Sequence, residues 1–366
     1  MSKKLSVGIV GLPNVGKSTL FNSITKAGVA AQNYPFCTIE PNVGIVSIPD
    51  PRLDVLSKLS GSTEILPAKI EFVDIAGLVE GASKGEGLGN QFLSHIRSTS
   101  VIAHMVRCFE SKDITHVHGR VDPVADCDII NSELILSDLD FVEKVITTLQ
   151  KKSKTNDKVV TATLEVLEMI KQQLAMGKMI NLLDLDEKQW ELVNEFDFIT
   201  KKKQIYVANV AEDEIAQSND YVSQLQDYVK QSGQEVIVLS AALEEECAEL
   251  SVDEKTEFLN ELGVTQSGID LLSVACFKLL GLQTYLTTGQ KETRAWTILK
   301  GMTAPQAAGV IHTDFEKGFI RANVISYDEF VTSGSFKQAK ETGMLRQEGK
   351  DYVMQDGDVV EFLFNV

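Results

Sequence analysis

The chain has 366 residues, of which 43% are hydrophobic and 24% charged, as in an ordinary globular protein of two or three domains. A net charge of −17 argues against broad, purely electrostatic binding to nucleic acid, and no apolar run approaches the roughly 18 residues of a membrane span. Five cysteines without a C-x-x-C pair are typical of reduced thiols in the cytoplasm, and the first strand begins too early to leave room for a signal peptide.

Strand-like and helix-like stretches alternate over residues 1–118, which predicts a parallel or mixed α/β sheet. The same character returns over residues 201–282, so we expect both parts to form one domain. The expected strands are 6–10, 43–48, 69–74, 101–109, 204–209 and 235–239, and the expected helices are about 19–27, 89–97, 221–231 and 267–280.

The region between these parts has a helical pattern. Apolar residues recur every three or four positions over residues 135–149 and again over 160–174, on either side of a polar break. This spacing predicts an inserted antiparallel helical hairpin, a coiled-coil arm, over residues 119–200. Such an arm either binds a partner or only packs on the core, and the sequence leaves both open.

The last segment, residues 283–366, is rich in strand-like stretches separated by glycine-containing turns typical of hairpins. A small, β-rich α+β domain fits this pattern. Its expected strands are 295–298, 318–324, 351–354 and 359–364.

Residues 11–18 read Gly-Leu-Pro-Asn-Val-Gly-Lys-Ser and stand between an apolar strand and a helix. This arrangement predicts a phosphate-binding loop, because the glycines let the backbone bend and the helix N-terminus directs amides at an anion. Lys17 would reach the β- and γ-phosphates, and the hydroxyl of Ser18 would bind Mg²⁺. The chain is therefore expected to bind a nucleoside triphosphate.

A second motif, Asp74-Ile-Ala-Gly77, follows the strand at 69–74. Asp74 would hold Mg²⁺ through water, and the amide of Gly77 would contact the γ-phosphate. Thr38 either offers a second Mg²⁺ ligand or is a bare turn residue. The glycine-rich stretch after Gly77 is typical of a switch loop that orders around the γ-phosphate.

Leu78 stands where many GTPases place the glutamine that orients the attacking water, and leucine cannot hydrogen-bond water. Another group must then position the water, or hydrolysis is slow. Asn14, inside the phosphate loop, either lends its carbonyl to a monovalent cation such as K⁺ or braces the loop.

The choice of base is expected to depend on Asn209-Val-Ala-Glu212 at the end of a strand, where GTPases usually carry Asn-Lys-x-Asp. Val210 and Glu212 replace the Lys and the Asp. Losing the bidentate contact to guanine costs on the order of 1.5–3 kcal/mol per hydrogen bond, which removes a guanine preference without creating one for adenine. Asn209 can serve either purine, and the backbone amides of Ser240 and Ala241 would close over the base.

Together with Tyr34-Pro-Phe-Cys-Thr-Ile-Glu-Pro-Asn42 and the segment 294–320, these motifs resemble the YchF/Obg-like ATPase subfamily of the Obg translation-factor GTPases. The resemblance spans the whole chain, and the Asn-x-x-Glu replacement is its most specific element. It implies a P-loop nucleotide-hydrolase domain, a helical arm and a C-terminal TGS domain. It also implies hydrolysis of ATP, with GTP bound less well, and association with the ribosome or its large subunit in translation or stress regulation.

Two residues gain a role only from the resemblance. Phe109 matches an aromatic residue near the base, and His116 matches a histidine that helps to place the attacking water; without the family, His116 is interpreted as a solvated loop residue. The expected site comprises catalytic Lys17, Gly77 and His116, metal-binding Ser18, Thr38 and Asp74, and nucleotide-binding Asn14, Val15, Gly16, Lys17, Ser18, Thr19, Phe109, Asn209, Val210, Glu212, Ser240 and Ala241.

Two other functions stay open: an Obg-type GTPase, and a nucleotide-regulated binding module with incidental turnover, for which Leu78 is an argument. Contact with RNA through the TGS domain is also open. Residues 283–366 contain nine Lys and Arg, but their eleven Asp and Glu favour a mixed, solvated surface.

Overall fold

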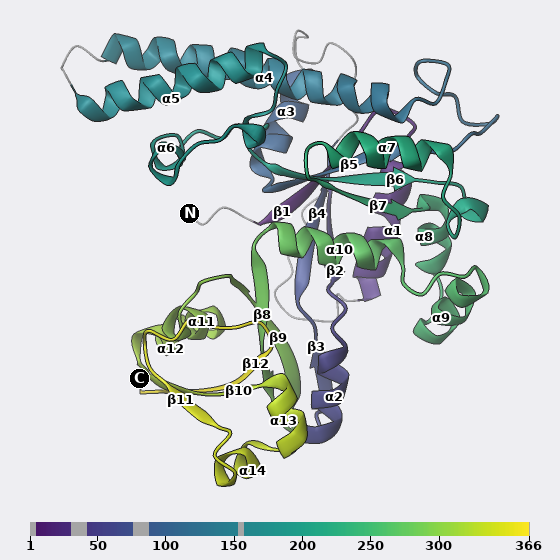
Figure 1. The fold of residues 1–366 in the computed structure, drawn as a ribbon. Coiled ribbons are helices and arrows are strands. Elements are labelled where there is room, and N and C mark those ends of the chain that lie inside the picture. Colours follow the sequence, from purple (N-terminus) through teal and green to yellow (C-terminus); the bar gives the residue numbers. More distant parts are fainter. Residues whose placement is uncertain (1–4, 31–41, 76–87, 153–156, 366) are drawn as a thin grey trace. The chain divides into compact units, whose positions relative to one another are not determined.

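The computed structural model describes residues 5–30, 42–75, 88–152 and 157–365 (Figure 1). Contacts within the chain divide it into two compact units. The first comprises residues 1–45 and 71–272, and the second comprises residues 46–70 and 273–366.

The first unit is built on a six-stranded sheet with the order β2-β4-β1-β5-β6-β7. β1 pairs in parallel with β4 and β5, and β6 pairs in parallel with β5 and β7, so the carboxyl ends of these five strands share one edge. The central strand β1 is buried along its whole length. The strands are β1 (Ser6–Val10), β2 (Val43–Ser47), β4 (Lys69–Asp74), β5 (Val101–Arg107), β6 (Lys203–Asn209) and β7 (Glu235–Leu239).

All four helices expected from the sequence are present. Their observed ends differ from the expected ones by one or two residues, except the end of the first helix, which lies three residues later. The helices of the first unit, besides the two longest, are α1 (Lys17–Ala30), α3 (Leu88–Ser98), α6 (Glu187–Leu192), α7 (Asp220–Lys230), α8 (Ala241–Cys247) and α9 (Val252–Glu261), with short η1 (Ile180–Leu182) and η2 (Glu212–Glu214). The helix α10 (Gly268–Leu279) spans the boundary between the units, which falls after Leu272.

The two longest helices, α4 (Pro123–Lys152) and α5 (Lys158–Ala175), lie side by side, and their far ends extend away from the sheet (Figure 1). Val142, Leu167 and Ile170 are among the apolar side chains buried with them. The periodic pattern therefore predicted two packed helices correctly, although α4 begins well before the pattern does. Within the described residues, no helix combines the length and apolarity needed to cross a membrane.

The second unit contains a mixed sheet with the order β11-β10-β12-β8-β9-β3. β8 pairs antiparallel with β9, β10 pairs antiparallel with β12 and β11, and β12 runs parallel to β8. Tyr285, Ala307 and Val360 lie in the core. The elements are α2 (Pro51–Ser60), β3 (Glu64–Leu66), β8 (Leu282–Thr288), β9 (Glu292–Leu299), α11 (Ala304–Ile311), α12 (Thr313–Lys317), β10 (Phe319–Ser326), α13 (Tyr327–Ser333), α14 (Phe336–Glu341), β11 (Arg346–Glu348) and β12 (Asp358–Phe364).

The structure corrects two expectations in this unit. The sequence pattern assigns residues 46–70 to the α/β domain, but β3 pairs in parallel with β9, which joins the segment to the C-terminal sheet. The expected strand at 351–354 is absent from the described residues, since Val353 forms only an isolated bridge with Thr303.

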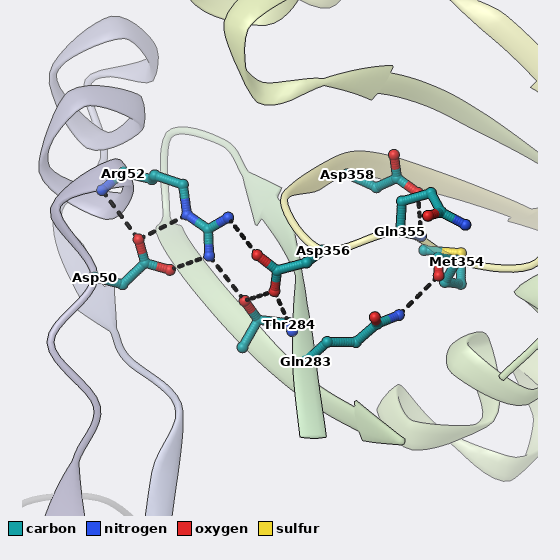
Figure 2. Close-up of polar contacts among 8 residues, drawn as sticks. All are labelled: Asp50, Arg52, Gln283, Thr284, Met354, Gln355, Asp356 and Asp358. Atoms are coloured by element: carbon teal, nitrogen blue, oxygen red, sulfur yellow. Dashed lines mark hydrogen bonds and ion pairs between the residues drawn. The ribbon is translucent and has the colours of Figure 1, made fainter. Parts of the chain in front are cut away.

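Arg52 fastens α2 to the rest of the second unit (Figure 2). Its guanidinium donates to both carboxylate oxygens of Asp50, each at 2.8 Å, and to Asp356 at 2.9 Å. Asp356 in turn accepts from the backbone N–H of Thr284 at 3.0 Å. These residues line part of a cavity of about 490 Å³, and because Arg52 is neutralised by the two aspartates, we assign the cluster a structural role.

Candidate functional site

The loop between β1 and α1 holds a buried lysine. Lys17, the first residue of α1, is 7% exposed, and its ammonium donates to the backbone carbonyl of Leu12 at 2.6 Å. Burial lowers the pKa of Lys17 to about 8, against the opposing effect of the Asp74 carboxylate. A cation held in this way by a backbone carbonyl is available to an anion bound at the helix N-terminus.

The loop requires a glycine at position 16. Gly16 has φ 98°, a left-handed conformation, and a Cβ there would lie 2.4 Å from Nδ2 of Asn209. Asn14 also has positive φ (63°), and its side-chain amide donates to the carbonyl of Thr115 at 3.2 Å. This bond ties the loop to the segment after β5 through the amide nitrogen of Asn14, whereas the expected monovalent cation would bind its carbonyl oxygen.

Asn209, at the carboxyl end of β6, joins the phosphate-binding loop to the first residue of α8. Its Nδ2 donates to the carbonyl of Val15 at 2.9 Å, and its Oδ1 accepts from the N–H of Ala241 at 2.9 Å. The side chain is 4% exposed. Because an amide nitrogen carries two hydrogens, one donor remains for a ligand beside the loop.

The other base-site residues follow the same edge. Val210 is buried next to Asn209, and the hydroxyl of Ser240 caps α8. Glu212 begins η2 and is exposed, so its carboxylate is accessible to solvent and to a ligand.

The expected metal ligands are partly described. Ser18 is exposed in the first turn of α1, next to half-buried Thr19, and Asp74 ends β4 in a half-buried position. Burial raises the pKa of Asp74, and the charge of Lys17 lowers it. A hydroxyl and a carboxylate are hard oxygen donors of the kind that Mg²⁺ prefers, so these residues fit that ion. Thr38, Gly77 and Leu78 lie outside the described residues.

Metal binding by a dense protein cluster has no support in the described part of the chain, where no three His, Cys, Asp or Glu side chains gather as a metal site. This agrees with the chemistry of Mg²⁺ in phosphate sites, where one or two protein oxygens act together with waters and the phosphates themselves.

Arg107, at the end of β5, holds the loop that follows the strand through hydrogen bonds. The sequence did not predict this role. Arg107 is 1% exposed, and its guanidinium donates to the carbonyls of Phe109 at 3.0 Å and Ile114 at 2.9 Å. The same guanidinium lies 4.6 Å from the centroid of the Phe109 ring. Half-buried Phe109 is thereby held at the edge of the sheet where Asn209 also lies, since Arg107 and Asn209 are paired in the register of β5 and β6.

Without the family resemblance, the sequence around His116 suggests a solvated loop residue. The structure shows instead that His116 is buried. It is 8% exposed, and its Nε2 lies 2.9 Å from Oδ2 of Asp126 in the first turn of α4. Its Nδ1 accepts from the backbone N–H of His118 at 3.2 Å. Burial raises the pKa of the Asp126 carboxyl, and the hydrogen bond with His116 opposes that rise.

A second buried histidine, His104, was also missed. It lies on β5 opposite Val10, is stacked on Tyr206 at 5.1 Å between ring centroids, and its Nδ1 has no hydrogen-bond partner among the described residues. Burial, and secondarily the charge of Lys17, lowers the pKa of His104 to about 3, so the ring is neutral. Nothing in its local sequence distinguishes it from other residues of a buried strand.

Comparisons with known proteins agree with this site. A family described as "50S ribosome-binding GTPase" matches residues 6–138, and the YchF-GTPase_C family, described as a protein of unknown function, matches residues 282–365. The "Ribosome-binding ATPase YchF" of Pasteurella multocida is 54% identical over 98% of this chain and 99% of its own. That of Bacillus subtilis is 52% identical over 99% of this chain and 100% of its own.

A solved structure, titled "Structure of the Schizosaccharomyces pombe YchF GTPase", superposes with a TM-score of 0.90 and 37% identity, and covers 99% of this chain and 98% of that one. Similarity at these levels over full length extends to both units, and the phosphate-binding loop with its lysine and its bridging asparagine lies within it. The chain therefore belongs to the YchF family, in the Obg-like group of P-loop nucleoside triphosphatases.

Proposed function

We propose that this protein is a Mg²⁺-dependent ATPase that works as a conformational switch on the ribosome, in the cytoplasm. The observation that carries the proposal is the position of Asn209, which joins Val15 of the phosphate-binding loop to Ala241. In this proposal the purine base binds beside the Asn209 side chain. The acid three residues later is Glu212 and not Asp. The printed names of the bacterial relatives, ribosome-binding ATPases, support ATP as the substrate and the ribosome as the partner.

In this proposal each residue has one task at the nucleotide. Lys17 binds the β- and γ-phosphates, with the backbone of the loop and of Gly77 donating to them, and Phe109 packs on the base. Ser18, Asp74 and Thr38 hold Mg²⁺, which neutralises phosphate charge when it is bound. His116 orients the attacking water, because Leu78 stands where many GTPases have a glutamine for that task. A K⁺ ion bound by the carbonyl oxygen of Asn14 would add positive charge beside the phosphates.

Two parts of the chain away from the nucleotide site are proposed to respond to whether the nucleotide is ATP or ADP. The helices α4 and α5 correspond to the helical arm, and the C-terminal sheet of the second unit to a TGS domain, with contacts to the large subunit or the whole ribosome and to RNA. A phosphate-contacting RNA surface predicts that ribosome association weakens as salt rises. Cosedimentation at several salt concentrations, with an ATP analogue and with ADP, tests both ideas. If ribosome association changes neither with salt concentration nor with the bound nucleotide, both the RNA-contacting surface and the nucleotide-dependent switch are contradicted.

Titration calorimetry with non-hydrolysable ATP and GTP analogues and Mg²⁺, in K⁺ and again in Na⁺, tests the substrate. We expect tighter binding of the adenine analogue. Replacing Val210 by Lys together with Glu212→Asp should shift preference toward guanine, whereas Asp213→Asn, an exposed acid next to Glu212, should leave preference unchanged. Tighter binding of guanine by the unaltered protein overturns the proposal.

That outcome would favour the second candidate, an Obg-type GTPase. The fission yeast relative is titled a GTPase, and the family that matches residues 6–138 is also described as a GTPase. Equal binding of both bases with negligible turnover would favour a nucleotide-regulated binding module instead.

A further inference from the structure

The loop between β5 and α4 makes two contacts through neighbouring residues, and they reach different parts of the first unit. The carbonyl of Thr115 accepts from Asn14 of the phosphate-binding loop at 3.2 Å. The next residue, His116, contacts Asp126 of α4 at 2.9 Å. One peptide unit thus separates a contact with the phosphate-binding loop from a contact with the 30-residue helix α4.

The hydrogen bonds of His116 identify the nitrogen that carries its proton. Nδ1 accepts from the N–H of His118 and so must present a lone pair. In a neutral imidazole the proton is then on Nε2, which donates it to the carboxylate of Asp126. The tight turn that holds His118 in place is closed by Gly119 N–H, which donates to the carbonyl of His116 at 3.1 Å.

This arrangement separates two roles on one ring. The nitrogen bonded to Asp126 is fixed by a buried carboxylate, while the nitrogen with the lone pair accepts from a backbone N–H of the same short turn. If that turn rearranges, Nδ1 loses its present donor and can accept from another one, and the bond from Nε2 to Asp126 does not depend on that donor. A basic nitrogen with the opposite nitrogen oriented by a carboxylate is the arrangement that enzymes use to control which tautomer acts.

We infer that Asp126 is a positioning residue for His116: it keeps the proton on Nε2, so that Nδ1 is the nitrogen that accepts a hydrogen bond from the attacking water once His118 N–H withdraws. The inference rests on the proposed function, in which His116 orients that water. It also places His116 under the control of α4, because Asp126 lies in the first turn of that helix. A partner that shifts α4 would move His116 with it.

The variant Asp126→Asn tests this role, because it removes the negative charge that holds the proton on Nε2 and offers an amide N–H that competes for that nitrogen, which favours the tautomer with the proton on Nδ1. We expect kcat for the preferred nucleotide to fall on the order of 100-fold, the range of general acid–base contributions, while KM and the affinity for a non-hydrolysable analogue stay within about twofold. The matched control is Asp128→Asn, two residues along α4, which removes the same charge but keeps an oxygen that can accept from the Tyr228 hydroxyl, now at 2.7 Å from Asp128. It should leave kcat unchanged.

NMR of the imidazole nitrogens gives a readout that does not depend on turnover. In the unaltered protein the His116 signal, assigned by its loss in His116→Gln, should show the proton on Nε2, and Asp126→Asn should move it to Nδ1. A proton on Nδ1 in the unaltered protein overturns the inference, as does an unchanged kcat in Asp126→Asn with analogue binding intact. Failure of the proposed function is distinct, since it shows as absent turnover in the unaltered protein.

Discussion

The two cations beside the expected nucleotide site are held differently from Arg52 in the second unit. At the nucleotide site, Lys17 donates to the carbonyl of Leu12, and Arg107 donates to the carbonyls of two residues of its own loop. In the second unit, Arg52 donates to the carboxylates of Asp50 and Asp356 (Figure 2). Backbone carbonyls position a cation but do not cancel its charge, whereas carboxylates do both.

The difference has a functional meaning. A buried cation without full compensation is unfavourable in the free protein and becomes favourable when an anion binds beside it. The lowered pKa of Lys17 expresses that cost. Arg52, neutralised by two acids, has nothing to gain from a ligand and serves stability. Substitutions at these cations should therefore separate into those that change ligand binding and those that change only the free energy of unfolding.

The largest effect is expected from Lys17→Met, which removes the charge and keeps most of the side-chain length. Loss of charge-assisted contacts with two phosphates should weaken binding of an ATP analogue on the order of 100-fold. The free energy of unfolding of the nucleotide-free protein should not fall, because methionine is easier to bury than an ammonium. Calorimetry and chemical denaturation measure the two quantities.

Lys26→Met is the matched control for that experiment, since Lys26 is on the same helix and pairs with Glu249 at 2.8 Å on the surface. It should bind the analogue like the unaltered protein. Equal affinity of the Lys17→Met protein would show that the buried charge does not serve the phosphates.

The second prediction concerns pH. The pKa of Lys17 is about 8 in the free protein, and bound phosphate must raise it, because an anion favours the charged form. Binding above pH 8 therefore takes up a proton, and affinity should fall toward a limit of about tenfold per pH unit as pH rises. Calorimetry in buffers of different ionisation enthalpy measures the uptake. No uptake at pH 9, or the same uptake in Lys17→Arg, contradicts the assignment to Lys17.

The fold was predictable where local pattern and tertiary structure agree. The α/β alternation and the apolar periodicity of α4 and α5 predicted most elements of the first unit. In the second unit, Ser326 and Glu329 form a capping box that was a readable signal for α13 and was not used. The three-residue strand β3 could not be predicted, because its partner β9 is far along the chain and its own pattern is too short to show alternation.

The site divides in the same way. The phosphate-binding loop, Asp74 and Asn209 were predicted because their chemistry depends on a fixed spacing around a strand end. Arg107 and Asp126 were not, because their partners are backbone carbonyls and a histidine in a loop, and no residue pattern encodes such contacts. The roles assigned to all the site residues remain predictions, and Gly77 and Thr38 also lie outside the described residues.

The third prediction compares the two arginines through the same substitution. Arg107→Lys keeps the charge but cannot hold two carbonyls and the Phe109 ring at once, so binding of the adenine analogue should weaken by about 1–2 kcal/mol. Arg52→Lys loses the bidentate pair with Asp50 and should lower the free energy of unfolding by about 1 kcal/mol without changing affinity. If Arg52→Lys also weakens binding of the analogue, or if Arg107→Lys leaves binding unchanged, the distinction drawn between the two cations is wrong.

The smallest effect is a coupling energy within the second unit. Gly357 has φ 84°, and a Cβ there would lie 2.6 Å from a terminal guanidinium nitrogen of Arg52. Gly357→Ala should therefore lower the free energy of unfolding through two causes, the left-handed backbone and displacement of Arg52 from Asp356. In an Arg52→Ala background only the backbone cause is left, so the alanine should cost less there by about 0.5–1 kcal/mol. Chemical denaturation of the four proteins measures this difference. If Gly357→Ala lowers the free energy of unfolding equally in both backgrounds, Arg52 moves aside freely and its pair with Asp356 contributes little to stability. If the loss is smaller in the Arg52→Ala background, the cluster of Arg52, Asp50 and Asp356 acts as one structural unit.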